Sequence, residues 1–338
     1  MRFEAPGKLY LCGEYAVLRP GSFAVAAPTK RKLWVDAEEA EEGSLSSSLF
    51  PSPLPFSWEG GKFLSPVPPE GCFALFAVRL LEGFCREEAG RSLRLEIKIG
   101  SGLEEGGKKL GFGSSAALCC ALARAVTSLY DVRLSEEEML KLALLAHFSW
   151  QGSGSGGDVA ASLLGPVFYS SFDPAWLSRR LSFETVFKGW PGLFAEKLSF
   201  PRLSSVALWT GRPASTASLI RGVRPRGRFA ARSDELCLLA REGAAKGKAD
   251  LVERVIRLSR YNLESFAKPE GVPLEGRAVR RALRIAGALG VAAKTSGAGG
   301  GDCAIALGGE GKCRELSLAW KGAGFAVFDD VLDLKREK

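Results

Sequence analysis

The stretch Lys108-Lys-Leu-Gly-Phe-Gly-Ser-Ser-Ala-Ala117 places glycines directly before a pair of serines and an apolar run. Residues 91–100 before it alternate between apolar and charged side chains, which predicts a half-buried strand. From about Ser114 to Tyr130 the chain has the composition of an apolar helix. Glycines at such a junction let backbone N–H groups approach an anion at the helix N-terminus, where the helix dipole favours negative charge. The stretch therefore predicts a phosphate site, with an ordinary helix capped by Ser114 or Ser115 as the alternative.

Two further glycine-rich loops follow along the chain. Gln151-Gly-Ser-Gly-Ser-Gly-Gly-Asp158 ends in a carboxylate that can serve as a general base, a metal ligand or a helix N-cap. Lys294-Thr-Ser-Gly-Ala-Gly-Gly-Gly-Asp302 lies between two apolar segments. Its glycines are more than a tight turn needs, so they indicate close approach of the backbone to a ligand. The first loop, Lys108–Ala117, is not a Walker A loop, because no Gly-Lys-Ser or Gly-Lys-Thr ends it, and its spacing differs from the dinucleotide-binding fingerprint.

A fourth motif lies near the start of the chain, in Ala5-Pro-Gly-Lys8-Leu-Tyr-Leu-Cys-Gly-Glu14-Tyr15. Lys8 follows a glycine, where its ammonium group can reach a phosphoryl group during transfer. A solvated lysine on a strand is the alternative interpretation for Lys8.

The rest of the pattern predicts an α+β protein built from two closely packed halves, residues 1–195 and 196–338. Short strands are expected within 2–36, a long loop or loose hairpin at 41–70, and a helix at 73–90. Ser135-Glu-Glu-Glu has the form of a capping box that starts a helix running to Phe148. In the second half we expect strands at 204–210, 302–307 and 324–328, and helices at 229–245, 248–267, 274–289 and 311–323.

Composition narrows the class of protein. The net charge is +8, but the basic residues are scattered except at Arg221–Arg232 and no aromatic residues interleave with them, so nucleic-acid binding is not expected. Attraction of small polyanionic substrates explains the sign equally well. No apolar run has membrane-spanning length and Met1–Lys8 has no signal region, so a cytoplasmic protein without a membrane partner is expected. Eight cysteines without a CxxC pair indicate buried free thiols. The oligomeric state is not predicted.

Taken together, the motifs resemble the GHMP kinases, the family of galactokinase and of homoserine, mevalonate and phosphomevalonate kinases. The glycine-rich loops occur in the family's order and at comparable separations. Within the family the resemblance is strongest to the bacterial phosphomevalonate kinases, and it spans almost the whole chain, most weakly at 40–72 and 176–202. The segments that carry it are Gly7-Lys-Leu-Tyr, Gly13-Glu-Tyr-Ala, Lys108-Lys-Leu-Gly-Phe-Gly-Ser-Ser, Tyr169-Ser-Ser-Phe-Asp173, Trp209-Thr210 and Ser296-Gly-Ala-Gly-Gly-Gly-Asp-Cys.

The resemblance implies a fold and a set of roles. The fold would be an N-terminal domain like ribosomal protein S5 and a C-terminal ferredoxin-like domain. Lys8 and Asp158 would flank the acceptor phosphate, and Lys8 would stabilise the γ-phosphoryl group during transfer. The ATP phosphates would contact Lys109, Gly111, Gly113, Ser114, Ser115 and Ala116, and Ser115 would also help to hold Mg²⁺. The acceptor, a phosphorylated acid, would contact Tyr15, Ser155, Ser215, Thr216, Ser296, Gly297, Gly299 and Gly300.

One position departs from the family pattern. Mevalonate kinases carry a glutamate ligand for Mg²⁺ eleven residues before the aspartate, whereas here that position is His147. We expect His147 to be a packed helix residue rather than a ligand. The implied reaction is transfer of the γ-phosphoryl group of ATP to 5-phosphomevalonate. Another GHMP kinase acting on mevalonate or homoserine, the related decarboxylase, and a relative that binds a ligand without catalysis remain as alternatives.

Overall fold

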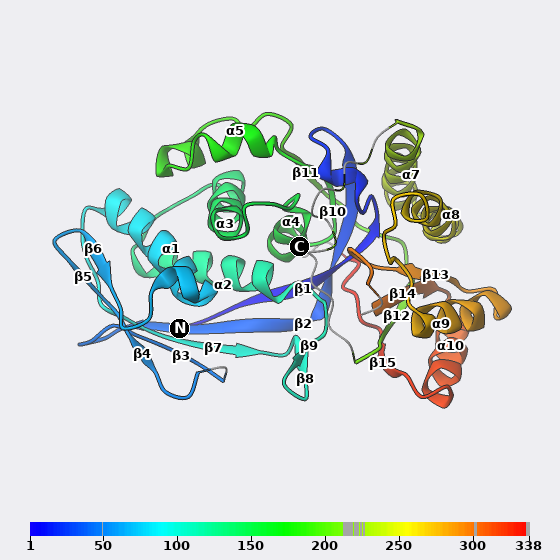
Figure 1. Cartoon of the computed structure of the whole chain (residues 1–338), viewed down its shortest axis with the longest axis horizontal. Coiled ribbons are helices and arrows are strands. Elements are labelled where there is room, and N and C mark those ends of the chain that lie inside the picture. The colour runs from blue at the N-terminus through cyan, green and yellow to red at the C-terminus, as the bar shows by residue number, and fades with distance from the viewer. Residues whose placement is uncertain are drawn as a thin grey trace.

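The computed structural model describes residues 1–48, 50–211, 219, 223, 225, 227–300 and 303–335. A seven-stranded sheet, a four-stranded sheet, two short hairpins and the helices packed on them make up the described chain (Figure 1). Ser215, Thr216 and Gly301 lie outside the described residues, as do Arg221, Gly222, Arg224 and Arg226 of the arginine-dense segment.

The larger sheet belongs to the first half of the chain. Its strands run in the order β11-β10-β2-β7-β3-β4, and β1 also pairs with β2. The long strand β2 forms the centre, because it pairs antiparallel with β1, β10 and β7. The bounds are β1 Arg2–Cys12, β2 Phe23–Glu39, β3 Ser44–Ser47, β4 Leu54–Pro55, β7 Leu95–Ser101, β10 Val167–Ser170 and β11 Phe194–Lys197.

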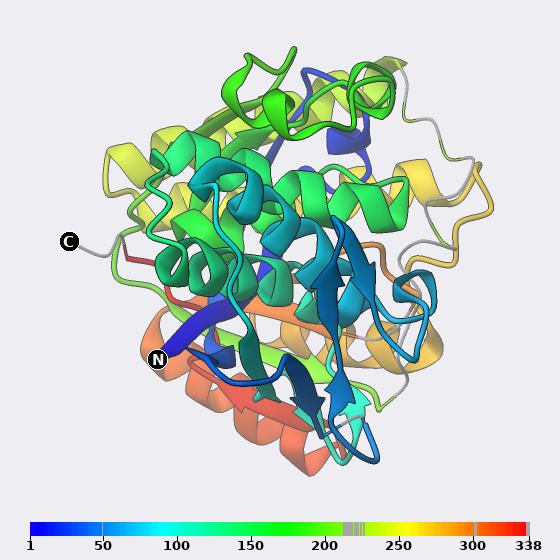
Figure 2. The same ribbon diagram turned by 90° about the vertical axis from the view of Figure 1, so that its left-hand side faces the viewer.

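The alternation of apolar and charged residues explains strand β7, because successive side chains of a strand point to opposite faces of the sheet. Leu95 and Ile97 are buried, whereas Lys98 is exposed. Two short hairpins accompany the sheet: β5 Ser57–Glu59 with β6 Lys62–Leu64, and β8 Glu104–Glu105 with β9 Lys108–Lys109. The segment expected as a long loop or loose hairpin at 41–70 contains two short antiparallel pairs, β3 with β4 and β5 with β6, which agree with the hairpin alternative. They lie at the near side of the molecule in the turned view (Figure 2).

Helices α1 to α4 gather on one face of this sheet (Figure 1). Their bounds are α1 Phe73–Ala89, α2 Ser114–Leu129, α3 Glu136–Gln151 and α4 Gly157–Leu164, and the short α5 Pro174–Ser178 follows. The predicted capping box starts α3: the Ser135 hydroxyl accepts from the Glu138 N–H (3.3 Å), and the Glu138 carboxylate accepts from the Ser135 N–H (2.7 Å). Helix α2 is almost entirely buried between sheet and helices, as its apolar composition predicted.

The second half forms a four-stranded antiparallel sheet in the order β13-β14-β12-β15. The strands are β12 Ser204–Trp209, β13 Ala292–Thr295, β14 Cys303–Gly308 and β15 Ala326–Asp329, and the helices are α7 Gly227–Ala245, α8 Ala249–Ala267, α9 Arg277–Ala288 and α10 Glu310–Gly322. All the helices and strands expected here are therefore present, with ends shifted by a few residues.

A continuous apolar core joins the halves. The largest buried cluster contains residues of the first sheet together with Trp209, Cys237 and Ile305 of the second half. The domain boundary expected between residues 195 and 196 falls inside strand β11. A division of the chain at that point stays a prediction. All eight cysteines are free thiols, and seven of them are buried. No helix among the described residues is long and apolar enough to span a bilayer.

Candidate active site

The phosphate loop connects the β8–β9 hairpin to helix α2. Gly111 and Gly113 have φ of 79° and 78°, the left-handed region that favours glycine. The first hydrogen bond within the helix runs from the Ala117 N–H to the Gly113 carbonyl (3.1 Å). The N–H groups of the preceding residues therefore have no acceptor within the helix. Gly113 is the N-cap and no side chain caps the helix, which makes the alternative of a serine cap wrong. Ser114, Ser115 and Ala116 are instead the first helical residues, at the end that attracts anions.

Lys8 lies against this loop. Its backbone N–H donates to the Phe112 carbonyl (2.7 Å), which ties strand β1 to the loop. A Cβ added to Gly113 would lie 2.9 Å from Lys8 Cε, so only glycine lets the lysine stem pass. The side chain is buried and its Nζ lies 5.1 Å from the centroid of the Tyr10 ring. The alternative of a solvated strand lysine is therefore wrong.

Asp158 is the second residue of helix α4. The N-cap is Gly156, so the interpretation of Asp158 as the N-cap is wrong. Its Oδ1 accepts from the Val159 N–H (3.0 Å), and its Oδ2 lies 4.0 Å from His147 Nε2. The carboxylate is partly exposed, as a group that meets a substrate or metal must be.

His147 connects Asp158 to the phosphate loop. Its Nε2 lies 3.1 Å from Ser115 Oγ and 2.9 Å from the amide nitrogen of Gln151. Burial lowers the pKa of His147, the Asp158 carboxylate opposes this shift, and the Lys8 ammonium adds to it. The expectation of a packed residue holds, but the imidazole also touches the predicted site.

Tyr10 and Ser155 form the floor between strand β1 and helix α4. The Tyr10 hydroxyl lies 3.2 Å from Ser155 Oγ, and the Tyr169 hydroxyl donates to the Ser155 carbonyl (2.7 Å). Burial, and secondarily the Asp158 carboxylate, raises the pKa of Tyr10 far above its usual value. Tyr10 is therefore a neutral donor beside Lys8, a residue that the sequence motif contained but that received no predicted role.

The third glycine-rich loop reaches this floor from the second half. Ser296 Oγ accepts from the Tyr10 N–H (2.8 Å) and donates to the Tyr10 carbonyl (3.2 Å). The Tyr15 hydroxyl donates to the Ala298 carbonyl (2.6 Å), and burial raises the pKa of Tyr15 to about 12. Gly297, Gly299 and Gly300 have φ near 80°, and a Cβ at Gly299 would lie 2.6 Å from the Leu274 carbonyl oxygen. Ser296 and Tyr15 thus fasten the loop to strand β1, and substrate contact by them stays a prediction.

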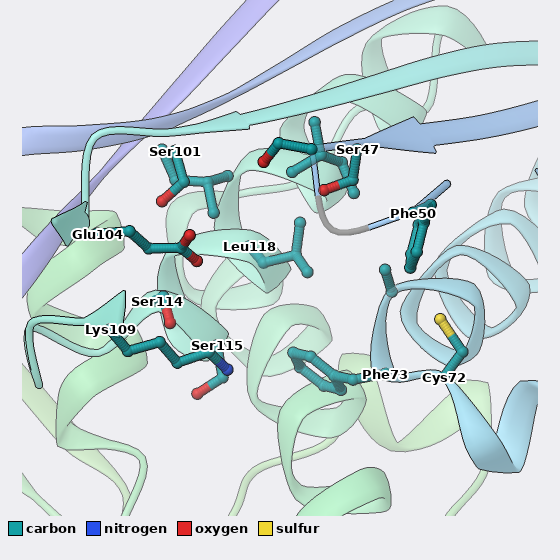
Figure 3. Close-up of a pocket in the computed structure, with 14 residues that line it drawn as sticks. Ser47, Phe50, Cys72, Phe73, Ser101, Glu104, Lys109, Ser114, Ser115 and Leu118 are labelled. Atoms are coloured by element: carbon teal, nitrogen blue, oxygen red, sulfur yellow. The ribbon is translucent and has the colours of Figure 1, made fainter. Parts of the chain in front are cut away.

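Ser114 and Ser115 also line a pocket (Figure 3). Its walls combine Phe73, Leu118 and Phe50 with the polar side chains of Glu104 and Lys109, and Figure 3 shows Lys109 extending toward Ser115. Sequence reasoning assigned no role to the apolar part. Phe50 and Phe73 come from segments outside every motif, so no local signal pointed to them.

Comparison with known proteins identifies the family of this chain. The family model for the GHMP kinases N terminal domain matches residues 76–166, and that for the GHMP kinases C terminal domain matches residues 240–324. The chain belongs to the GHMP kinase family, and it is an ATP-dependent phosphotransferase with the α+β fold of that family.

Individual members of the family are similar to this chain over nearly its whole length. The chain is 32% identical to the phosphomevalonate kinase of a Streptomyces species, over 95% of this chain and 94% of that one. It is 28% identical to the mevalonate kinase of Pyrococcus abyssi, over 95% and 92% of the two chains. The solved structure of Streptococcus pneumoniae phosphomevalonate kinase in complex with phosphomevalonate and AMPPNP superposes with a TM-score of 0.84 at 24% identity, covering 98% of this chain and 100% of that chain.

Proposed function

We propose that this chain transfers the γ-phosphoryl group of ATP to the phosphate of 5-phosphomevalonate. An oxygen of the acceptor phosphate forms a bond to Pγ, the bond from Pγ to the β–γ bridging oxygen breaks, and ADP and 5-diphosphomevalonate leave. The observation that carries the phosphotransfer is the buried Lys8 against Gly113 of the phosphate loop. The 32% identity to a phosphomevalonate kinase over 95% of the chain supports the choice of acceptor.

The pocket suits ATP in one orientation. Ser114 and Ser115 lie at the α2 N-terminus, where free N–H groups and the helix dipole stabilise phosphate oxygens. The apolar wall that includes Phe73 and Leu118 lies farther along the same pocket and suits a purine ring. Lys109 extends toward Ser115 (Figure 3) and would neutralise phosphate charge.

Lys8 supplies the charge that the reaction needs most. The acceptor is a phosphate monoester, whose oxygens are already anionic near neutral pH and need little deprotonation. The main barrier is the approach of two polyanions, which cations and N–H dipoles reduce. Burial of Lys8 between the loop and the Tyr10 ring strengthens its field at the site and fixes its direction.

Mg²⁺ fits the residues present. Ser115 Oγ and the Asp158 carboxylate are hard oxygen donors on either side of His147 Nε2, at 3.1 and 4.0 Å. Kinase magnesium sites take few protein ligands and complete their shell with phosphate oxygens and water. Bound there, Mg²⁺ would neutralise charge on the β- and γ-phosphates.

Asp158 has an orienting role in this proposal. A carboxylate near an anionic acceptor repels it unless a cation lies between them, so Asp158 serves the magnesium side of the site rather than proton abstraction. Ser155 and the loop that follows Ser296 would contact the acceptor from the opposite side. Ser215 and Thr216 are proposed to contact the acceptor as well.

An acceptor panel tests the proposal. Purified protein is supplied with ATP, Mg²⁺ and one of 5-phosphomevalonate, mevalonate or homoserine, and ADP release is followed by a coupled assay. We expect turnover with 5-phosphomevalonate alone. Turnover only with an unphosphorylated acceptor would contradict the proposal.

The second candidate is a mevalonate kinase, because several relatives carry that name at similar coverage. His147 at the position of the glutamate ligand argues against it. The panel above separates the two.

A further inference from the structure

His147 has a buried imidazole that borders the phosphate site, yet the proposed transfer gives it no role. Its side chain is 6% exposed. One atom of the ring, Nε2, lies 3.1 Å from Ser115 Oγ, 2.9 Å from Gln151 Nε2 and 4.0 Å from Asp158 Oδ2. These groups come from helices α2, α3 and α4, so a single nitrogen connects the helices that surround the site.

The Gln151 contact indicates which hydrogen bond His147 makes. The amide nitrogen of Gln151 carries hydrogens and no acceptor, so the nitrogen that it faces accepts. In a neutral imidazole the proton then resides on Nδ1, and the Gln151 N–H and the Ser115 hydroxyl share the single lone pair of Nε2. Gln151 Nε2 also donates to Ser115 Oγ (3.4 Å), so a serine that gives its hydrogen to His147 keeps one lone pair of Oγ for a cation. A serine with a free hydrogen would turn it toward a phosphate oxygen instead.

Packing holds the ring in this orientation. The Phe73 ring meets the His147 ring edge-on, with centroids 6.3 Å apart and planes at 77°. Phe73 also lines the pocket. The orientation of the imidazole is therefore set from the nucleotide side of the site.

We propose that His147 is a positioning residue that makes Ser115 a magnesium ligand, by accepting the hydrogen of its hydroxyl and directing the remaining Oγ lone pair into the phosphate site. The inference rests on the proposed function only in taking ATP with Mg²⁺ as the ligand. It separates this chain from enzymes that place a carboxylate at the same position, because the imidazole acts through Ser115 and adds no negative charge.

Binding of AMPPNP, a non-hydrolysable ATP analogue, tests the role without any acceptor. Calorimetry measures its Kd with Mg²⁺ and with EDTA for the wild type, His147→Phe and His147→Gln. We expect Mg²⁺ to lower the Kd of the wild type for AMPPNP, and we call the ratio of the Kd with EDTA to the Kd with Mg²⁺ the gain from Mg²⁺. In His147→Phe this ratio should be about tenfold smaller, in the range seen for partners of metal ligands. The Gln side chain reaches a similar distance and offers an acceptor, so His147→Gln should restore most of it.

Phe148→Leu is the matched control on the same helix. Phe148 is buried against Phe172, with ring centroids 5.5 Å apart, and does not line the pocket. It should cost stability in thermal unfolding without changing the gain from Mg²⁺. Equal loss of the gain in Phe148→Leu and His147→Phe would overturn the proposal, since it would reflect helix packing alone.

A double-mutant cycle with Ser115→Ala completes the test. If His147 acts through Ser115, His147→Phe should have little further effect on the gain from Mg²⁺ once the hydroxyl is gone. Additive losses would overturn the proposal. A protein that shows the full gain from Mg²⁺ yet phosphorylates none of the three acceptors contradicts the proposed function and leaves the role of His147 standing.

Discussion

Lys294, the third residue of strand β13, donates to the carboxylate of Glu14, which follows strand β1, and both side chains are almost completely buried. The pair joins the two halves directly behind Tyr10, whose carbonyl lies 3.4 Å from Lys294 Nζ. One oxygen of Glu14, Oε2, has no hydrogen-bond partner within the described chain. Desolvated charges of this kind are costly when one partner is lost.

Removing one member of this pair should therefore destabilise the protein strongly. Lys294→Met or Glu14→Met alone should lower the free energy of unfolding by about 3–5 kcal/mol, because the remaining polar group stays buried without its partner. The double apolar variant Lys294→Met with Glu14→Met should recover much of that loss. Urea unfolding measures the wild type, the two single variants and the double variant. A double variant as unstable as the sum of the singles would contradict the prediction, because it would show that the two side chains contribute independently and not as a pair.

Lys8→Ala should lower turnover by roughly 10²–10³-fold, the effect of removing one preorganised charge-stabilising group from a transition state. The Kd for ATP should change little, because the nucleotide contacts lie along the loop and pocket. Steady-state kinetics and calorimetry measure the two quantities. Lys32→Ala, on strand β2 of the same sheet and paired with Glu4 at the surface, is the control and should leave both unchanged. Unchanged turnover in Lys8→Ala would remove the proposed role.

Gly113→Ala should weaken both nucleotide binding and turnover. The added methyl would lie 2.9 Å from Lys8 Cε and the residue has φ of 78°, a conformation that costs an alanine about 1–2 kcal/mol. We expect the Kd for ATP to rise by about tenfold. Gly106→Ala on the β8–β9 hairpin is the control, since its φ is 54° and its added methyl meets nothing within 4 Å. Equal effects in the two variants would mean that backbone strain alone, and not contact with Lys8, is responsible.

Phe73→Ala should raise the Kd for ATP. Loss of an aromatic wall for the base costs about 1–3 kcal/mol, so a tenfold change or more is expected. Phe76→Ala is a close control. Both rings pack on Trp150, with centroids 5.5 and 5.4 Å away, but Phe76 does not line the pocket. A similar rise in Kd for both variants would place the base elsewhere.

Local patterns predicted most of the fold. Strand β7 follows from alternation, α3 from its capping box, and α2 from its apolar composition. These signals are local because side-chain period and helix ends depend on neighbouring residues. Within 41–70 the local pairs β3–β4 and β5–β6 agree with the expected loose hairpin, whereas the pairing of β3 with β7 about fifty residues later was not predicted, because it depends on a distant partner.

The site was predictable in its parts but not in its connections. Gly113, Lys8 and Asp158 each belonged to a motif, and the motifs' order indicated that they meet. The helix N-caps are Gly113 and Gly156 rather than Ser115 and Asp158. This choice depends on backbone angles that the sequence motifs do not determine. The apolar pocket wall is assembled from segments far apart in the chain, so only the folded structure brings it together.

The bonds between Ser296 and Tyr10 link residues 286 positions apart. A chain emerging from the ribosome has strand β1 available long before the third glycine-rich loop is synthesised. Contacts of such sequence separation form late, after a large loss of chain entropy. Catalytic competence should therefore arise only when synthesis is nearly complete, so that an unfinished chain with its phosphate loop already formed would not hydrolyse or transfer the phosphates of cellular nucleotides.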